Sequence, residues 1–164
     1  MGTRHARLTC MSLGVMCVLL MSLLVGCGGQ PDSREELKTL RPLKILAEPP
    51  NSTQIGRGEF AGRSYDPVAL EIPTTIELVY ASSSGVEDLR VHYEEALEGF
   101  RVIANGVPTN RSTSFLAQRS NPPVRVQIDI NAKKALVRQL LPSSLSPPPR
   151  GSRAYVTVTV DNGR

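Results

Sequence analysis

Val124-Arg125-Val126-Gln127-Ile128-Asp129-Ile130 is the stretch that decides the fold. Apolar side chains occupy every second position along it, which is the period of a strand with one buried face and one face in water. A second stretch near the end of the chain, Tyr155 to Val160, repeats the alternation with three valines on one face. Together the two stretches predict antiparallel β-structure with a polar outer surface.

Weaker alternation and turn signals extend this pattern toward the N-terminus. Further strands are predicted at 43–47, 75–80, 89–94 and 100–104. Asn105-Gly106 follows the last of these, and Asn-Gly favours a hairpin because both residues tolerate positive φ. Residues 51–66 are rich in Gly, Ser and Asn and predict a loop.

Three segments depart from the alternation. Asn131 to Leu141 carries apolar residues at helical spacing and predicts one short crossover helix. Ser33 and Glu36 have the spacing of a capping box, which predicts either a short helix over 34–40 or a disordered polar spacer. The proline-rich segment 143–153 predicts an exposed loop.

Six to eight short strands in a domain of about 120 residues predict a β-sandwich. Three segments resemble bacterial immunoglobulin-like domains, namely Ile45–Pro50 as a first strand, Phe100–Val107 as a central strand and hairpin, and Tyr155–Asp161 as the final strand. The chain departs from that family in having no Trp. The resemblance implies an all-β, immunoglobulin-like antiparallel β-sandwich for residues 43–164, and it implies no particular activity. The short crossover helix predicted at 132–141 is not standard in that family.

The first 26 residues differ in character from the rest. Arg4 and Arg7 precede an uncharged run from Leu13 to Val25, which has the length of a signal-peptide core. All four Met and two of the three Cys lie before residue 27. The alternative is an uncleaved transmembrane helix over Leu8 to Val25, whose 18 residues only just reach the required length of about 17–25 apolar residues.

The run ends in Leu24-Val25-Gly26-Cys27, which resembles the lipobox of bacterial lipoproteins. The resemblance implies that the signal peptide 1–26 is removed and that Cys27 carries diacylglycerol and a further acyl chain such as palmitate. Residues 27–42 would then form the lipidated N-terminus and a tether. Gly28, rather than Asp, after the cysteine resembles the signal for sorting to an outer membrane. The expected location is therefore the cell envelope, in the outer membrane where the cell has one.

Charge and cysteine content narrow the choice of partners. Cleavage would remove two of 19 basic residues, against 15 acids, so the net charge would fall from +4 to +2. This balance argues against nucleic acid. Cys27 would be the only remaining Cys and, once lipidated, would leave none for a disulfide. The expected partners are the lipid bilayer through acylated Cys27, other envelope proteins and cell-wall polymer.

Residue types for catalysis or metal binding are sparse. His92 is the only His after residue 27, and it is predicted on the polar face of a strand, where neither a catalytic triad nor a zinc site is expected. Gly56, Gly58 and Gly62 do not have the spacing of a phosphate-binding loop. Asp66, Asp129 and Asp161 are too far apart in the sequence to form a calcium-binding loop. We therefore expect no catalytic, cofactor-binding or metal-binding residue, and Cys27 is the one predicted site residue, as the point of lipid attachment.

These observations predict a non-enzymatic binding or structural module of the envelope, and two alternatives stay open. A cell-wall or polysaccharide hydrolase would use a pair of acids near Glu94–Glu98. The acids in question are Glu87, Asp88, Glu94, Glu95 and Glu98. A carrier of a small apolar ligand would need an enclosed apolar cavity of a few hundred Å³.

Overall fold

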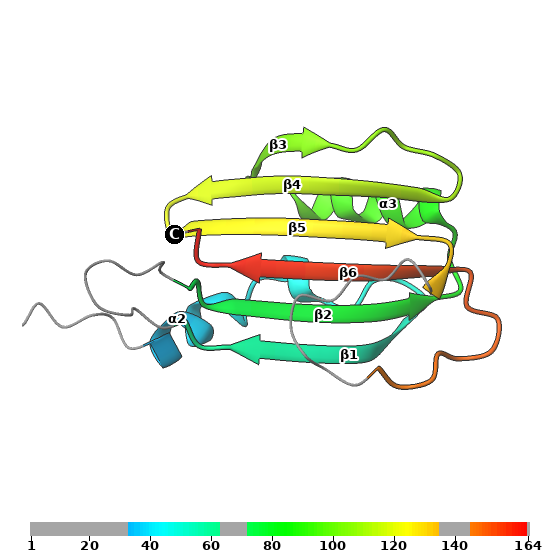
Figure 1. Cartoon of the computed structure of the whole chain (residues 1–164). Coiled ribbons are helices and arrows are strands. Elements are labelled where there is room, and N and C mark those ends of the chain that lie inside the picture. Colours follow the sequence, from blue (N-terminus) through cyan, green and yellow to red (C-terminus); the bar gives the residue numbers. More distant parts are fainter. Residues whose placement is uncertain (1–32, 63–71, 135–144, 164) are drawn as a thin grey trace, which may run out of the picture. The chain divides into compact units, whose positions relative to one another are not determined.

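The computed structural model describes residues 33–62, 72–134 and 145–163. They form an antiparallel sheet with helices on one face (Figure 1). The elements in chain order are α2 (Ser33–Leu40), the 3₁₀ helix η1 (Lys44–Leu46), β1 (Ser52–Phe60), β2 (Thr75–Ser82), α3 (Val86–Ala96), β3 (Arg101–Asn105), β4 (Ser112–Ser120), β5 (Pro123–Asn131) and β6 (Ala154–Asp161). The six strands lie in the order β1-β2-β6-β5-β4-β3, and every neighbouring pair is antiparallel.

The two strands with the clearest alternation form the middle of the sheet. β5 and β6 pair directly, with Ile128 opposite Val158, and both side chains are 0% exposed. The face that carries them, which we call the inner face, is covered by α3 and α2. The inner-face core comprises Ile76, Leu78, Tyr80, Phe115, Ala117, Val124, Val126, Ile128, Ile130, Ala154, Val156, Val158 and Val160, together with helix residues. The predicted mostly β, antiparallel architecture is confirmed.

The predicted strand at 89–94 is wrong, because this segment belongs to α3. Leu89 and Tyr93 alternate with polar residues, but together with Val86 they also have the three- and four-residue spacing of one helix face. All three are buried, whereas Val91 is 43% exposed. The Asp88 carboxylate accepts a hydrogen bond from the backbone N–H that precedes the helix, at 3.1 Å, and so satisfies one free donor at the helix start.

Two predictions near the start of the sheet are also wrong. Residues 43–47 contain η1 rather than a strand, with Ile45 as the single fully buried side chain. The predicted loop at 51–66 contains β1, an edge strand whose glycines made the segment resemble a loop. A Cβ at Gly56 would lie 2.6 Å from Leu145, so this position admits only Gly without a shift of its neighbour. β4 was not predicted, because few of its inward residues are large and apolar.

A second sheet, which a sandwich needs, is not found among the described residues, where helices cover the inner face instead. The immunoglobulin-like sandwich is thus not confirmed. Asn131, the first residue of the predicted crossover helix, ends β5, and residues 135–144 lie outside the described ranges. The predicted signal peptide and Cys27 lie outside them too. In the part of the chain that is described, no helix is long and apolar enough to cross a membrane.

Of the two alternatives for residues 34–40, a short helix or a disordered spacer, the structure shows the helix, α2, which is part of the folded unit. Leu37 and Leu40 are 8% and 2% exposed and join the inner-face core. In the first turns of α2, the Glu36 carboxylate accepts hydrogen bonds from Thr74 Oγ1 and, at 3.0 Å, from Asn162 Nδ2. Apolar burial and these bonds together hold α2 against one end of β2 and the end of the chain.

Two buried tyrosines in the core differ in their hydrogen bonding. Tyr80 Oη donates to the Leu46 carbonyl at 2.8 Å, whereas Tyr93 Oη has no partner among the described residues. We expect Tyr93→Phe to raise the free energy of unfolding by about 1 kcal/mol, because it removes a desolvated hydroxyl. Tyr80→Phe should lower it by about 1–2 kcal/mol, because it leaves a carbonyl without its donor. Urea unfolding followed by circular dichroism measures both, and equal losses in the two variants would contradict this account.

Because of the same two tyrosines, we expect the free energy of unfolding to fall at alkaline pH. Burial raises the pKa of Tyr80 from 10.0 to about 12 and also raises that of Tyr93. Both hydroxyls therefore stay protonated in the folded chain while those of the unfolded chain ionise, so stability is complete below pH 10 and falls above it. The expected loss is about 1.4 kcal/mol per pH unit for each tyrosine. Unfolding curves between about pH 9 and pH 11 test this, and Tyr93→Phe should roughly halve the slope.

Candidate binding groove

The outer face of the sheet, opposite α3, is polar and open over β4 and β5. Alternation places residues on this face in rows, because side chains opposite each other on paired strands point the same way. The rows from β4 to β5 are Ser112–Asn131, Ser114–Asp129, Leu116–Gln127 and Gln118–Arg125. On β2 and β6 the same face is buried, with Glu77 at 0% and Thr157 at 4% exposure. The accessible part of the outer face is therefore the half made by β4 and β5.

The loop between β3 and β4 forms the wall of a groove on this half. Its backbone is fixed by Thr109, whose Oγ1 accepts hydrogen bonds from the N–H groups of Arg111 and Ser112 at 3.2 and 2.9 Å. Gly106 donates its N–H to the Ser114 carbonyl at 2.9 Å. A Cβ on Gly106 would collide with Ser114 Oγ, so glycine allows the loop to lie directly on β4. Val107, 86% exposed, stands at the start of the loop.

Two adjoining hollows of about 300 and 310 Å³ make up the groove. Their shared lining residues are Gly106, Ser114, Gln127 and Asp129. Ser112 and Asn131 line the first hollow, and Ala104 and Leu116 line the second. The groove thus carries hydroxyl, amide and carboxylate groups at one end and apolar surface at the other. Each hollow is at the small end of the range of about 300–1,000 Å³ for ligand sites.

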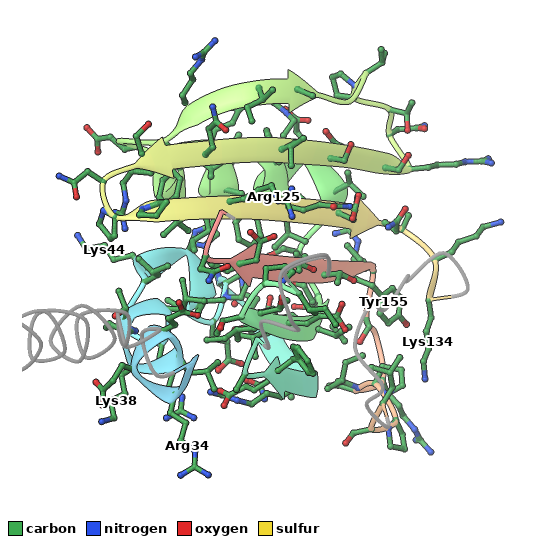
Figure 2. The ribbon with its side chains drawn as sticks, turned by 60° about the vertical axis from the view of Figure 1, so that its left-hand side comes forward. Arg34, Lys38, Lys44, Arg125, Lys134 and Tyr155 are labelled. Carbon is green, nitrogen blue, oxygen red and sulfur yellow. The ribbon has the colours of Figure 1, made fainter. Side chains whose placement is uncertain are left out.

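The polar groups of the groove are held in position by their neighbours. Gln127 Nε2 donates to Asp129 Oδ2 at 2.9 Å. On β6, Thr157 lies opposite Asp129, and its buried hydroxyl has no hydrogen-bond partner among the described residues. Tyr155 lies opposite Asn131, and its half-buried side chain packs against the cluster of Ile55, Val79 and Ala81. Figure 2 shows Tyr155 and Lys134 at one end of the sheet, and Arg34, Lys38 and Lys44 at the other.

A larger hollow of about 860 Å³ lies on the other side of the loop, at the start of α3. Its lining residues Glu87, Asp88 and Arg90 already have partners. Arg90 pairs with Glu87 at 2.6 Å, and Asp88 accepts the N–H of Gly85. Two acids at a helix N-terminus also disfavour an anionic ligand there. We therefore place the candidate site on the outer face.

Glu87, Asp88, Glu94 and Glu95 lie on α3, Glu98 follows its end, and all five are exposed. Arg90 pairs with both Glu87 and Glu94, and its hydrogen bond to Glu87 lowers the pKa of that carboxyl. His92 is also on α3, in edge-to-face contact with Tyr93 at 5.0 Å between ring centroids, and not on a strand as predicted. Glu87 and Asp88 line the larger hollow at the start of α3, whereas Glu94, Glu95 and Glu98 line none of the three hollows described.

The remaining predicted positions are dispersed. Asp129 lies in the groove, Asp161 pairs with Arg125 at 2.9 Å, and Asp66 is outside the described residues. Gly56 and Gly58 lie on β1 rather than in a phosphate loop. Among the residues that the structure describes, no group of three or more His, Cys, Asp or Glu side chains is placed to hold a metal ion.

The sequence does not predict the groove, because the polar positions of β5 also fit a sheet face exposed to solvent and because β4 is not among the predicted strands. Comparison with known proteins adds no assignment, since no protein-family model, curated protein or solved structure matches the chain.

Proposed function

We propose that this protein is a lipid-anchored lipoprotein of the bacterial envelope, and that it binds a ligand in the outer-face groove without chemical conversion. The observation that carries the binding role is the groove itself, where five polar side chains from two paired strands line adjoining hollows under a hydrogen-bonded loop. They are Ser112, Ser114, Gln127, Asp129 and Asn131. Side chains on neighbouring strands of a sheet are held more rigidly than those on loops, which suits recognition.

The proposed anchor agrees with where the folded unit begins. Cys27 precedes the start of α2 by six residues, which can span at most about 22 Å. A bilayer anchor at Cys27 would therefore keep α2 close to the membrane. The end of the sheet marked by Tyr155 and Lys134, which holds the groove, is the end away from α2 (Figure 2).

Binding is favoured over hydrolysis by the state of the acids. Glu87 and Glu94 both engage Arg90, and the groove contains a single carboxylate, Asp129. A glycosidase needs two carboxyl groups about 5–9.5 Å apart across the substrate. An apolar-ligand carrier is less favoured, since the groove is open and five polar side chains line its first hollow.

Co-sedimentation tests the binding role without assuming a ligand. Full-length protein in detergent micelles is mixed with detergent-washed envelopes, and the bound fraction is measured. We expect the wild type to sediment and the double variant Gln127→Ala/Asn131→Ala to lose most binding. Gln118→Ala is the control, because it is on the same outer face of β4 but does not line the groove. Equal sedimentation of all three proteins would overturn the assignment of the groove.

A further inference from the structure

The chemistry of the groove points to one class of ligand. We propose that it binds an uncharged, hydroxyl-rich glycan chain, with consecutive sugar residues in the two adjoining hollows. This ligand class rests on the proposed binding function of the groove and makes it specific.

The hydrogen-bonding groups of the groove match sugar hydroxyls. Ser112 and Ser114 each provide a hydroxyl that both donates and accepts, and Gln127 and Asn131 each provide an amide that does the same. A sugar hydroxyl is likewise a donor and an acceptor, so each can be satisfied by such groups. Asp129 adds an acceptor that can receive hydrogen bonds from two adjacent hydroxyls.

A peptide strand is a poorer match to this surface. Extended peptides bind sheets chiefly through backbone hydrogen bonds along an open edge. The groove lies on the face of β4 and β5, whose backbones are paired with each other from Ser112–Asn131 to Ser120–Pro123. The face offers side chains rather than free backbone groups, and side chains are what a glycan contacts.

Charge excludes the principal polyanions. No basic side chain lines either hollow among the described residues. Arg125, the nearest cation along β5, is bound to Asp161, with its Nε donating at 2.9 Å. A phosphate or a carboxylate in the groove would face Asp129 without a cation to offset the repulsion.

Apolar surface is present where the C–H face of a sugar ring would lie. Leu116 and Ala104 line the second hollow. Apolar surface beside a few placed polar groups is the usual composition of a small-ligand site. Two hollows sharing four residues suit a chain of linked rings better than a single monosaccharide.

Calorimetric titration of the full-length protein in micelles tests the ligand class. The probe is the uncharged tetramer of N-acetylglucosamine, and an anionic tetramer of galacturonic acid is the ligand control. We expect the uncharged tetramer to bind and the anionic one to bind at least fivefold more weakly, because its carboxylates would face Asp129. Gln127→Ala and Asn131→Ala should each weaken binding about fivefold, the loss expected for one hydrogen bond, and Gln118→Ala should change it less than twofold.

The outcomes separate this inference from the proposed function. Absence of binding by the tetramer of N-acetylglucosamine, equal binding by the double variant, or tighter binding of the anionic tetramer would overturn the glycan assignment. If envelope co-sedimentation still depended on Gln127 and Asn131 in that case, the groove would remain the binding site with a different ligand. If the tetramer did not bind and envelope co-sedimentation did not depend on Gln127 and Asn131, both the ligand class and the groove would be overturned.

Discussion

Replacing Cys27 with Ser is expected to abolish incorporation of a labelled fatty acid and to leave residues 1–26 on the protein. A serine hydroxyl cannot form the thioether to diacylglycerol, and the resemblance to the lipobox implies that cleavage follows that modification. Each acyl chain contributes about 0.8 kcal/mol per buried methylene, so loss of two or more chains removes the dominant attachment to the bilayer. Metabolic labelling and intact mass spectrometry measure the two effects.

Cys17→Ser is the matched control for this experiment. Cys17 is in the apolar run that would be removed, ten residues before Cys27. Its substitution should leave both the label and the mature mass unchanged. Labelling that persists in Cys27→Ser, or that disappears in Cys17→Ser, would contradict lipidation at Cys27.

Ile128→Ala is expected to lower the free energy of unfolding by about 2–5 kcal/mol, the range for truncation of a buried isoleucine. Ile128 is 0% exposed on a central strand, between β4 and β6 and under the helices. A cavity there removes contacts with several elements at once and cannot readily collapse. This loss is a large part of the stability of a domain of this size, about 5–15 kcal/mol.

Ile103→Ala provides the control with the same chemical change. Ile103 is 49% exposed on the edge strand β3, so the expected change is within about 0.5 kcal/mol. Urea unfolding with a common m-value compares the two variants. Similar losses in both would contradict the placement of Ile128 in the core and Ile103 at the edge.

The parts of the fold that local sequence predicts are those in which burial follows a simple period. β5 and β6 were predicted because every second residue is apolar and all of those residues face the helices. In α3, by contrast, Leu89 and Tyr93 satisfy two periods, and only the burial of Val86 together with the exposure of Val91 decides for the helix.

The groove could be predicted only in part. Gln127 and Asp129 were recognised as the polar side of a strand, but their partners Leu116 and Ser114 belong to β4, whose place depends on strand pairing. The wall depends on Gly106 lying against Ser114, a contact set by the loop rather than by any motif. Polar alternation on β4 together with Asn105-Gly106 was the available signal. It indicated a hairpin but not which face would be open.

Photo-crosslinking in intact cells is the most direct test of the central claim that the outer-face groove over β4 and β5 is the binding surface. A photoreactive amino acid replaces Leu116 in the groove or, as the control, Val91 on the exposed side of α3. We predict a discrete adduct from position 116 that is lost when Asn131→Ala is added, and no such adduct from position 91. Adducts of equal yield from both positions, or none from position 116, would contradict the claim.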